Sequence, residues 1–147
     1  MEMARLPVPI VTVVTGEGGS GGALALAVGD RVLAMENAYY SVISPEGCST
    51  ILFKDAAMAP RAADVLRLTA PDLVRLEIME AAVPEPEGGA HADSPTAAAN
   101  LKTAILDCLS ELLDIPSEQL LARRYDRFRA FGAPGRQPVL PPTGESP

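Results

Sequence analysis

Five glycines lie within seven residues, Gly16 to Gly22, in the segment Gly-Glu-Gly-Gly-Ser-Gly-Gly. Glycine has no Cβ, so the backbone N–H groups of such a segment can come close to a ligand. Residues 23–28 are predicted to form a short helix, whose N-terminus carries a partial positive charge that favours an anion or an oxyanion. A flexible turn would explain one or two of these glycines but poorly explains five. The segment is therefore our first candidate for a binding or catalytic site.

The positions of Gly16, Gly18 and Gly21 also match the G-x-G-x-x-G pattern of dinucleotide-binding folds, with Glu36 fifteen residues beyond the last glycine. The predicted helix argues against that interpretation. Gly29-Asp30 ends it early, whereas a dinucleotide crossover with its helix spans at least about 10–12 residues. The segment is not a P-loop either, because no Gly-Lys-Ser/Thr ends it. A single match to the dinucleotide pattern is weak evidence.

The polar side chains give no convincing general base. Glu17 lies inside the glycine segment, where a ligand-orienting role and a solvated or turn-stabilising role are equally favoured. Glu46 follows a proline and is expected to fix a turn or a helix start. His91 lies in a Gly-Gly-Ala-His-Ala-Asp loop, and we interpret it as structural.

Metal-binding residues are few. Cys48 and Cys108 are sixty positions apart and His91 is the one histidine, so Cys and His alone cannot build a zinc site. We expect both thiols to be free, as in a reducing cytoplasm, and Cys48 to be a small core residue.

The elements that must position the glycine segment are short, in keeping with 14 prolines and 12 glycines. The β-branched run 8–14 comes directly before the segment and is typical of a strand buried on both faces. Further strands are predicted over 31–35, 39–43 and 78–83, and further helices over 49–53, 60–68, 94–113 and 117–131.

The last predicted helix carries four arginines in its second half, where positive charge complements the helix dipole. We interpret this cluster as a solvated face; it comprises Arg123, Arg124, Arg127 and Arg129. Beyond it, five prolines and no periodicity predict a disordered tail. The chain is thus divided into one domain, 1–131, and a tail, 132–147.

Composition excludes several classes of function. Twelve basic and nineteen acidic residues give a net charge of −7, which is the wrong sign for a nucleic-acid-binding protein. No targeting segment is visible, and the longest apolar runs fall well short of the ~18 residues of a membrane span. We expect a soluble, cytoplasmic protein with neither nucleic acid nor membrane among its partners.

A resemblance to a known family is carried by residues 7–54, PVPIVTVVTGEGGSGGALALAVGDRVLAMENAYYSVISPEGCSTILFK. They look very like the α subunit of the bacterial acetyl-CoA carboxylase carboxyltransferase, with GEGGSGGAL and YSVISPEGC as the most specific parts. The resemblance continues through 84–91, PEPEGGAH, and 123–125, RRY. That family belongs to the crotonase superfamily. The resemblance implies an α/β fold, a partial ClpP/crotonase-like spiral of ββα units with C-terminal helices.

The resemblance also implies a reaction. The family moves a carboxyl group from carboxybiotin to acetyl-CoA, giving malonyl-CoA for fatty-acid biosynthesis. Negative charge develops on the biotin ureido oxygen and on the thioester oxygen, and each needs preorganised N–H donors. The resemblance assigns the biotin side to the backbone amides of Gly21 and Gly22. The binding loop it implies comprises Gly16, Glu17, Gly18, Gly19 and Ser20.

The partners implied are a β subunit in an α2β2-type assembly, a biotin carboxyl carrier protein, biotin carboxylase and acetyl-CoA. Together they form an ATP-dependent carboxylase complex. Biotin is carried on the separate carrier protein, and no metal is implied in this chain. The β subunit holds most of the thioester site. Decarboxylated biotin can itself take the methyl proton, so no protein base is required. Contact of the arginine cluster with the β subunit or with CoA phosphates is an alternative to its solvated role.

Members of the family carry an N-terminal half before this segment, and this chain begins where that half would end. It resembles the later part of the α subunit, and we expect it to be inactive by itself. One alternative is a truncated, non-catalytic assembly module. Another is a crotonase-type acyl-CoA hydratase or isomerase; that chemistry usually needs a carboxylate just after the glycines, where residues 23–25, Ala-Leu-Ala, supply none.

Overall fold

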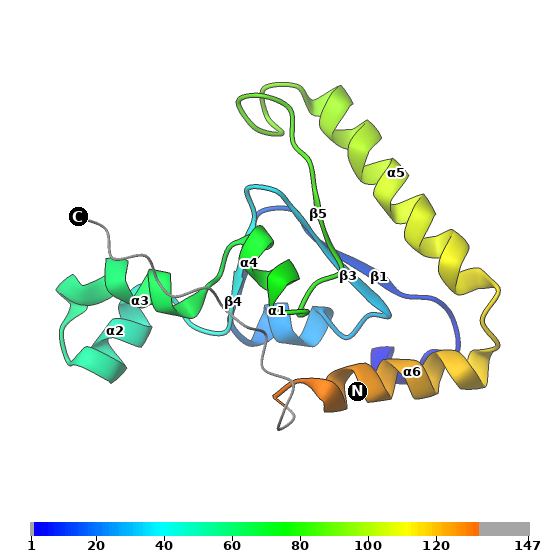
Figure 1. The fold of residues 1–147 in the computed structure, drawn as a ribbon, viewed down its shortest axis with the longest axis horizontal. Helices are drawn as coiled ribbons and strands as arrows, with labels where there is room; N and C mark the ends of the chain where they lie inside the picture. The colour runs from blue at the N-terminus through cyan, green and yellow to red at the C-terminus, as the bar shows by residue number, and fades with distance from the viewer. Residues whose placement is uncertain (1, 133–147) are drawn as a thin grey trace.

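The structure, a computed structural model, describes residues 2–132 and places helices around two small parallel sheets (Figure 1). The strands are β1 (Val11–Val14), β2 (Glu17–Gly19), β3 (Arg31–Met35), β4 (Tyr39–Ser41) and β5 (Ala81–Val83). The helices are η1 (Met3–Arg5), α1 (Ser20–Leu26), α2 (Pro45–Phe53), η2 (Ala56–Met58), α3 (Ala59–Leu66), α4 (Ala70–Arg75), α5 (Ser94–Leu113) and α6 (Ser117–Ala130). The predicted tail lies outside the described residues, apart from Gly132.

Two consecutive ββα units surround the glycine segment. The first is β1-β2-α1 and the second is β3-β4-α2. The first strands of the two units pair in parallel, with Val13 opposite Leu33, and β5 joins the other side of β3. The second strands pair in parallel in the smaller sheet, with Gly18 opposite Tyr40. The chain therefore has the repeating ββα arrangement that the family resemblance implied.

The core lies around the central strand β3, where residues 32–35 are all buried. Leu73 and Met79 pack in the same cluster, together with the small side chains of Ala70 and Ala97. Alanines at these positions let helices approach the sheet closely, which suits a sequence with only 4% aromatic residues.

Three predicted strands are longer than the observed ones. The strand predicted over 39–43 ends at Ser41. The run 8–14 forms a strand only over Val11–Val14, and its residues are half-buried rather than buried on both faces. Within the described residues β1 pairs only with β3, so one of its edges has no neighbouring strand. The predicted strand 78–83 shortens to Ala81–Val83, because the N–H groups of Ile78 and Met79 donate to the Leu73 carbonyl at 2.9 and 3.2 Å.

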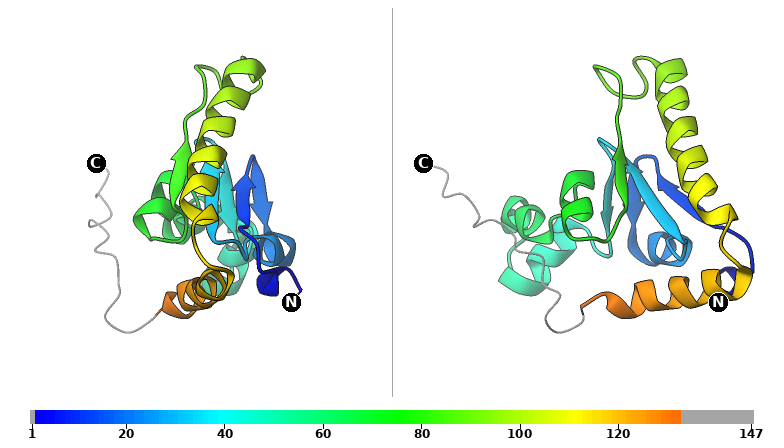
Figure 2. Two further views of the ribbon diagram at one scale, coloured as in Figure 1. Left: turned by 90° about the vertical axis from the view of Figure 1, so that its right-hand side faces the viewer. Right: turned by 45° about the vertical axis from the view of Figure 1, so that its right-hand side comes forward.

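The two C-terminal helices match their predictions to within one residue. Figure 2 shows α5 leaning along the parallel sheet and α6 crossing below it, near the N-terminal segment. Asp93 caps α5, since its carboxylate accepts a hydrogen bond from the Thr96 N–H at 3.1 Å. In α6, Ser117 donates its hydroxyl to the Pro7 carbonyl at 3.2 Å.

The interpretation of the arginine cluster as a solvated face is wrong for Arg124, which is only 2% exposed. Its guanidinium forms a bidentate pair with the buried Asp30, from Nε to Oδ1 at 2.8 Å and from Nη2 to Oδ2 at 2.7 Å. The remaining N–H groups donate to carbonyls of the N-terminal segment, those of Met3, Ala4, Leu6 and Val8. The planar fork of five donors is what suits arginine to this position.

We predict that Arg124→Ala lowers the free energy of unfolding by about 3–5 kcal/mol, because the Asp30 carboxylate then stays buried without its charged partner. Urea denaturation of the chain, followed by circular dichroism, measures the change. Arg129→Ala is the control: Arg129 is exposed on the same helix, so its loss should change stability by less than about 0.5 kcal/mol. Equal effects of the two substitutions would contradict this account of the ion pair.

Candidate functional site

The glycine segment lies at the carboxyl edge of the three-stranded sheet. Because β1, β3 and β5 are parallel, the residues after their last positions gather at one edge, namely Gly16, Glu36 and Glu85. The Tyr39 N–H donates to the Gly16 carbonyl at 3.1 Å, and the Glu85 N–H donates to the Glu36 carboxylate at 3.1 Å. Ligands of open parallel sheets bind at this edge.

The segment itself is more ordered than the predicted loop. Residues 17–19 form β2, and α1 begins at Ser20, three residues earlier than predicted. Gly19 is the N-cap residue, with extended backbone, and Ser20 has a positive φ of 58°. A sharp turn of the backbone between strand and helix therefore lies within the candidate site.

The glycines of this segment divide into two kinds. A Cβ on Gly18 would lie 2.8 Å from Tyr40 Cδ2 and 3.0 Å from Val14 Cγ1, so Gly18 is required for packing. A Cβ on any of the other four would meet nothing within 4 Å in the described part of the chain; these are Gly16, Gly19, Gly21 and Gly22. Local packing does not explain those four.

The first turn of α1 presents backbone donors. Gly21 and Gly22 lie in this turn, and N–H groups at the start of a helix have no intrahelical acceptor. No side chain caps this helix in the described structure. With no Cβ on either residue, the two amides are open to a hydrogen-bond acceptor outside the helix.

Two carboxylates act on the Tyr39 hydroxyl: Glu17, which lies within the glycine segment, and Glu46, which lies outside it. Glu17 and Tyr39 are opposite each other in the β2–β4 pair. Partial burial, the charge of Glu17 and a hydrogen bond from the hydroxyl to its carboxylate raise the pKa of Tyr39, and Glu46 adds to this shift. Glu17 is thus engaged with Tyr39.

The loop after β5 reaches the same edge but is held by backbone contacts. Glu85 accepts hydrogen bonds from the N–H groups of Asn37 at 3.0 Å and Ala90 at 2.7 Å, and these bonds hold the pKa of Glu85 below its usual value. His91 is exposed beside Gly89 in this loop. Its structural role stays a prediction.

Two cavities adjoin α1. The smaller, of about 340 Å³, is lined by β1, the residues of the glycine segment up to Gly19, and α1. The larger, of about 1070 Å³, is lined by none of residues 16–22. Ala27 and Tyr40 line both cavities, so the two share a wall. The smaller one is within the usual size range of ligand sites, about 300–1,000 Å³.

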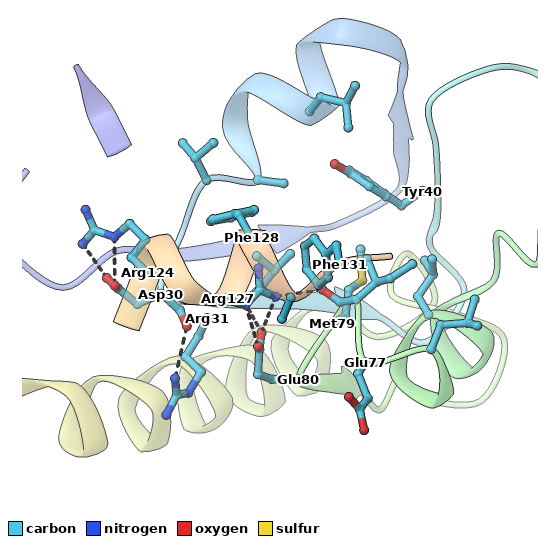
Figure 3. Close-up of a pocket in the computed structure, with 18 of the residues that line it drawn as sticks. Asp30, Arg31, Tyr40, Glu77, Met79, Glu80, Arg124, Arg127, Phe128 and Phe131 are labelled. Atoms are coloured by element: carbon cyan, nitrogen blue, oxygen red, sulfur yellow. Dashed lines mark hydrogen bonds and ion pairs between the residues drawn. The ribbon is translucent and has the colours of Figure 1, made fainter. Parts of the chain in front are cut away.

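The larger cavity is bounded by α6, whose role the sequence analysis missed. Figure 3 shows Phe128 and Phe131 at its wall beside Arg127, which is ion-paired with Glu80 at 3.0 Å. The Arg127 guanidinium lies 5.2 and 5.3 Å from the two ring centroids. The Arg127–Glu80 and Arg124–Asp30 pairs already satisfy four charged groups of this wall. This cavity therefore offers mainly apolar surface.

The remaining candidates have structural positions. Cys48 is buried and free, as predicted, and Cys108 is also free. Among the described residues, no group of three or more His, Cys, Asp or Glu side chains could hold a metal ion. Over the same residues, no helix is long and apolar enough to span a membrane.

The sequence of this chain is similar to those of known proteins. A family described as "Acetyl co-enzyme A carboxylase carboxyltransferase-like" matches residues 1–132. The carboxyl transferase subunit alpha of Thermus thermophilus acetyl-coenzyme A carboxylase is 59% identical over 131 residues, which are 89% of this chain and 42% of that protein. The "subunits beta/alpha" protein of Salinispora tropica is 56% identical over 135 residues, 92% of this chain and 24% of that protein. The chain thus spans less than half the length of these relatives.

One solved structure shows the fold. The Pseudomonas malonate decarboxylase hetero-tetramer in complex with coenzyme A matches with a TM-score of 0.67 at 16% identity, over 88% of this chain and 51% of that chain. Together with the two ββα units, this likeness confirms the predicted fold class, a partial crotonase-like α/β spiral with C-terminal helices.

Neighbouring glycines of β2 provide a test of this account. Gly18→Ala should lower the free energy of unfolding by about 1–3 kcal/mol, because its Cβ would overlap Tyr40 and Val14. Gly19→Ala should leave stability nearly unchanged, since its Cβ would enter open space. Thermal and urea unfolding of the two variants measure the difference. Equal destabilisation would show that the division of the glycines is wrong.

Proposed function

The chain belongs to the acetyl co-enzyme A carboxylase carboxyltransferase family, as its sequence predicted, and on this basis we propose that it is part of a carboxyltransferase α component. The proposed reaction moves the carboxyl group of carboxybiotin to acetyl-CoA and gives malonyl-CoA. The activity belongs to the longer protein assembled with a β subunit, since the chain covers 42% of its Thermus relative.

One observation carries the proposal. Of five glycines in the segment, only Gly18 has a packing reason inside the described chain. A Cβ on any of the other four would enter open space: Gly16 and Gly19 line the cavity of about 340 Å³, and Gly21 and Gly22 lie in the first turn of α1, the helix that forms part of its wall. A ligand that approaches the backbone itself would explain why these four positions are glycine.

The proposed chemistry rests on backbone donors. The N–H groups of Gly21 and Gly22 would donate to the biotin oxygen on which negative charge develops, and carboxybiotin supplies the carboxyl group. Preorganised donors of this kind lower the barrier, and the loss of one costs about 2.7–4 kcal/mol. Gly16, Glu17, Gly18, Gly19 and Ser20 would form the loop that shapes the approach to these donors.

No acid–base side chain of this chain is needed in the proposal. Glu17 accepts a hydrogen bond from Tyr39, Glu46 lies in the first turn of α2, and His91 is exposed in the loop after β5. The hydratase or isomerase alternative is less favoured, because α1 consists of Ser, Gly, Ala and Leu and contains no carboxylate.

Biotin would arrive on a separate carrier protein, as the family resemblance implies. Biotin carboxylase would load that carrier, and acetyl-CoA would be held mainly by the β subunit. The proposal places the reaction in fatty-acid biosynthesis and the protein in the cytoplasm, as part of an ATP-dependent complex.

Gly21→Val tests the donor assignment. In the full-length α subunit that contains this segment, assembled with its β subunit, carboxyl transfer should fall at least about a hundredfold. The valine side chain would occupy the approach to the donors, while a Cβ at this position meets nothing within 4 Å in the described chain, so the fold should persist. Malonyl-CoA formation and circular dichroism measure the two effects. Transfer within threefold of the parent would overturn the assignment.

The side chains provide the complementary test. His91→Ala, Glu17→Gln and Glu46→Gln, made singly in the same assembly, should each reduce transfer less than about tenfold, because the proposal gives them no proton to move. General acid–base groups typically contribute about 10²–10⁴-fold. Transfer rates at saturating acetyl-CoA decide the matter. A thousandfold loss for any one variant with an intact fold would favour acid–base chemistry, as in the hydratase alternative.

A further inference from the structure

Residues 45–67 form a helical lobe that projects from the body of the molecule. It contains α2, η2 and α3, and Figure 1 shows it beyond β4 and α4, on the side opposite α5. Its interior is made of small residues, with Cys48, Ser49 and Ala62 all buried. The Arg61 guanidinium of α3 lies 5.1 Å from the centroid of the Phe53 ring of α2. The lobe is therefore ordered by contacts between its own helices.

The outer surface of this lobe carries large apolar side chains that its interior does not use. Ile51 is 68% exposed, Leu52 60% and Val65 58%. Ile51 and Leu52 are consecutive residues of α2. Exposed apolar side chains that gather on a projecting element are typical of a contact with another protein. The chain's own core lies elsewhere, around β3.

The lobe adjoins the proposed reaction site. β4 pairs with β2 of the glycine segment, and the chain continues from β4 through Val42 and Ile43 directly into α2. Glu46 in the first turn of α2 is close enough to Tyr39 to influence its hydroxyl, which donates to Glu17. A protein that completes the site at the glycine segment would therefore meet α2.

The charge of the lobe does not by itself select its partner. The lobe has three acidic residues (Glu46, Asp55, Asp64) and three basic ones (Lys54, Arg61, Arg67), so it is neutral, whereas the chain has a net charge of −7. Two copies of an acidic chain repel each other at long range. The neutral lobe does not add to this repulsion, so its continuity with the glycine segment through β4, and not its charge, selects the chain that completes that site.

We propose that the helical lobe is the surface on which the carboxyltransferase β subunit docks, with Ile51, Leu52 and Val65 buried in the contact. This inference rests on the proposed function, which gives the glycine segment a β subunit as its partner. It adds the location: the β subunit packs on α2 and α3 and from there reaches the segment 16–22. The "subunits beta/alpha" relative, by its name, joins both parts in one chain.

The test compares matched surface changes in this chain. The double variant Ile51→Asp with Leu52→Asp alters the lobe, and Leu106→Asp with Leu113→Asp alters α5, where these two leucines are 52% and 68% exposed. Affinity for the β subunit that partners the Thermus thermophilus α subunit is measured by calorimetry. The lobe variant should bind at least about tenfold more weakly than the parent chain, and the α5 variant within about twofold.

A photo-crosslinking residue placed singly at 51 or at 113 serves as a second readout, because it does not depend on the charged variants folding. We expect crosslinks to the β subunit from position 51 and none from 113. If the parent chain binds but the lobe changes have no effect, or position 113 crosslinks instead, the docking surface is wrong while the β partnership stands. If the parent chain does not bind, both the surface and that part of the proposed function fail. Self-association of the parent chain that only the lobe variant loses would identify a second copy as the occupant and overturn the proposal.

Discussion

The Arg124 guanidinium joins three segments that are far apart in the sequence. It comes from α6, pairs with Asp30 at the start of β3, and holds the carbonyls of residues 3–8 ahead of β1. Asp30 in turn accepts from the Ile10 N–H at 2.8 Å and donates its own N–H to the Ile10 carbonyl at 2.8 Å. A neutral side chain in place of either partner would leave a buried charge, so the arrangement of β1, β3 and α6 depends on this pair.

One end of α1 is held against β1, and its other end is open. Gly29 follows this helix, and a Cβ there would lie 2.9 Å from Thr12 Oγ1 and 3.0 Å from the Ile10 carbonyl oxygen. The Thr12 hydroxyl also donates to the Leu26 carbonyl at 3.0 Å. The carboxyl end of α1 is thus packed tightly against β1, while its amino end, with Gly21 and Gly22, faces open space. Backbone donors held on a fixed helix in this way are preorganised for a ligand.

Local sequence patterns predicted the elements whose type can be read within one segment. Strand 31–35 and helix 94–113 were predicted at their observed bounds, because a continuous apolar run marks the first and a regular apolar stripe marks the second. The family resemblance rested on motifs around the glycine segment, and it gave the fold class. The strand predicted over 8–14 is longer than the observed strand, because the burial of a strand depends on its neighbouring strands and not on its own residues alone.

The position of Arg124 could not be read from composition, since its partner lies 94 residues away. Spacing within α6 held a signal nonetheless. Leu120, Arg124 and Phe128 follow one helical face, so an arginine lies where the apolar stripe requires a buried residue. A charge on the apolar face of a helix predicts a buried partner elsewhere in the chain. The different roles of the glycines, in contrast, left no signal in the sequence. Only the structure shows that a Cβ on Gly18, unlike one on its neighbours, would meet Tyr40 across the small sheet.

The distribution of apolar residues extends this reasoning to assembly. Among the described residues, twelve large hydrophobic side chains are exposed, whereas the fully buried core contains eight that are larger than alanine and cysteine. Three of the twelve, Ile51, Leu52 and Val65, lie on the helical lobe, and within residues 2–132 one edge of β1 has no neighbouring strand. A chain with this balance has a core sufficient to order its ββα units, and it leaves apolar surface for contacts outside itself. Because β4 pairs with β2 of the glycine segment and leads into the lobe, a partner on the lobe that extends along β4 would exclude water from the backbone donors, which strengthens each hydrogen bond that they form.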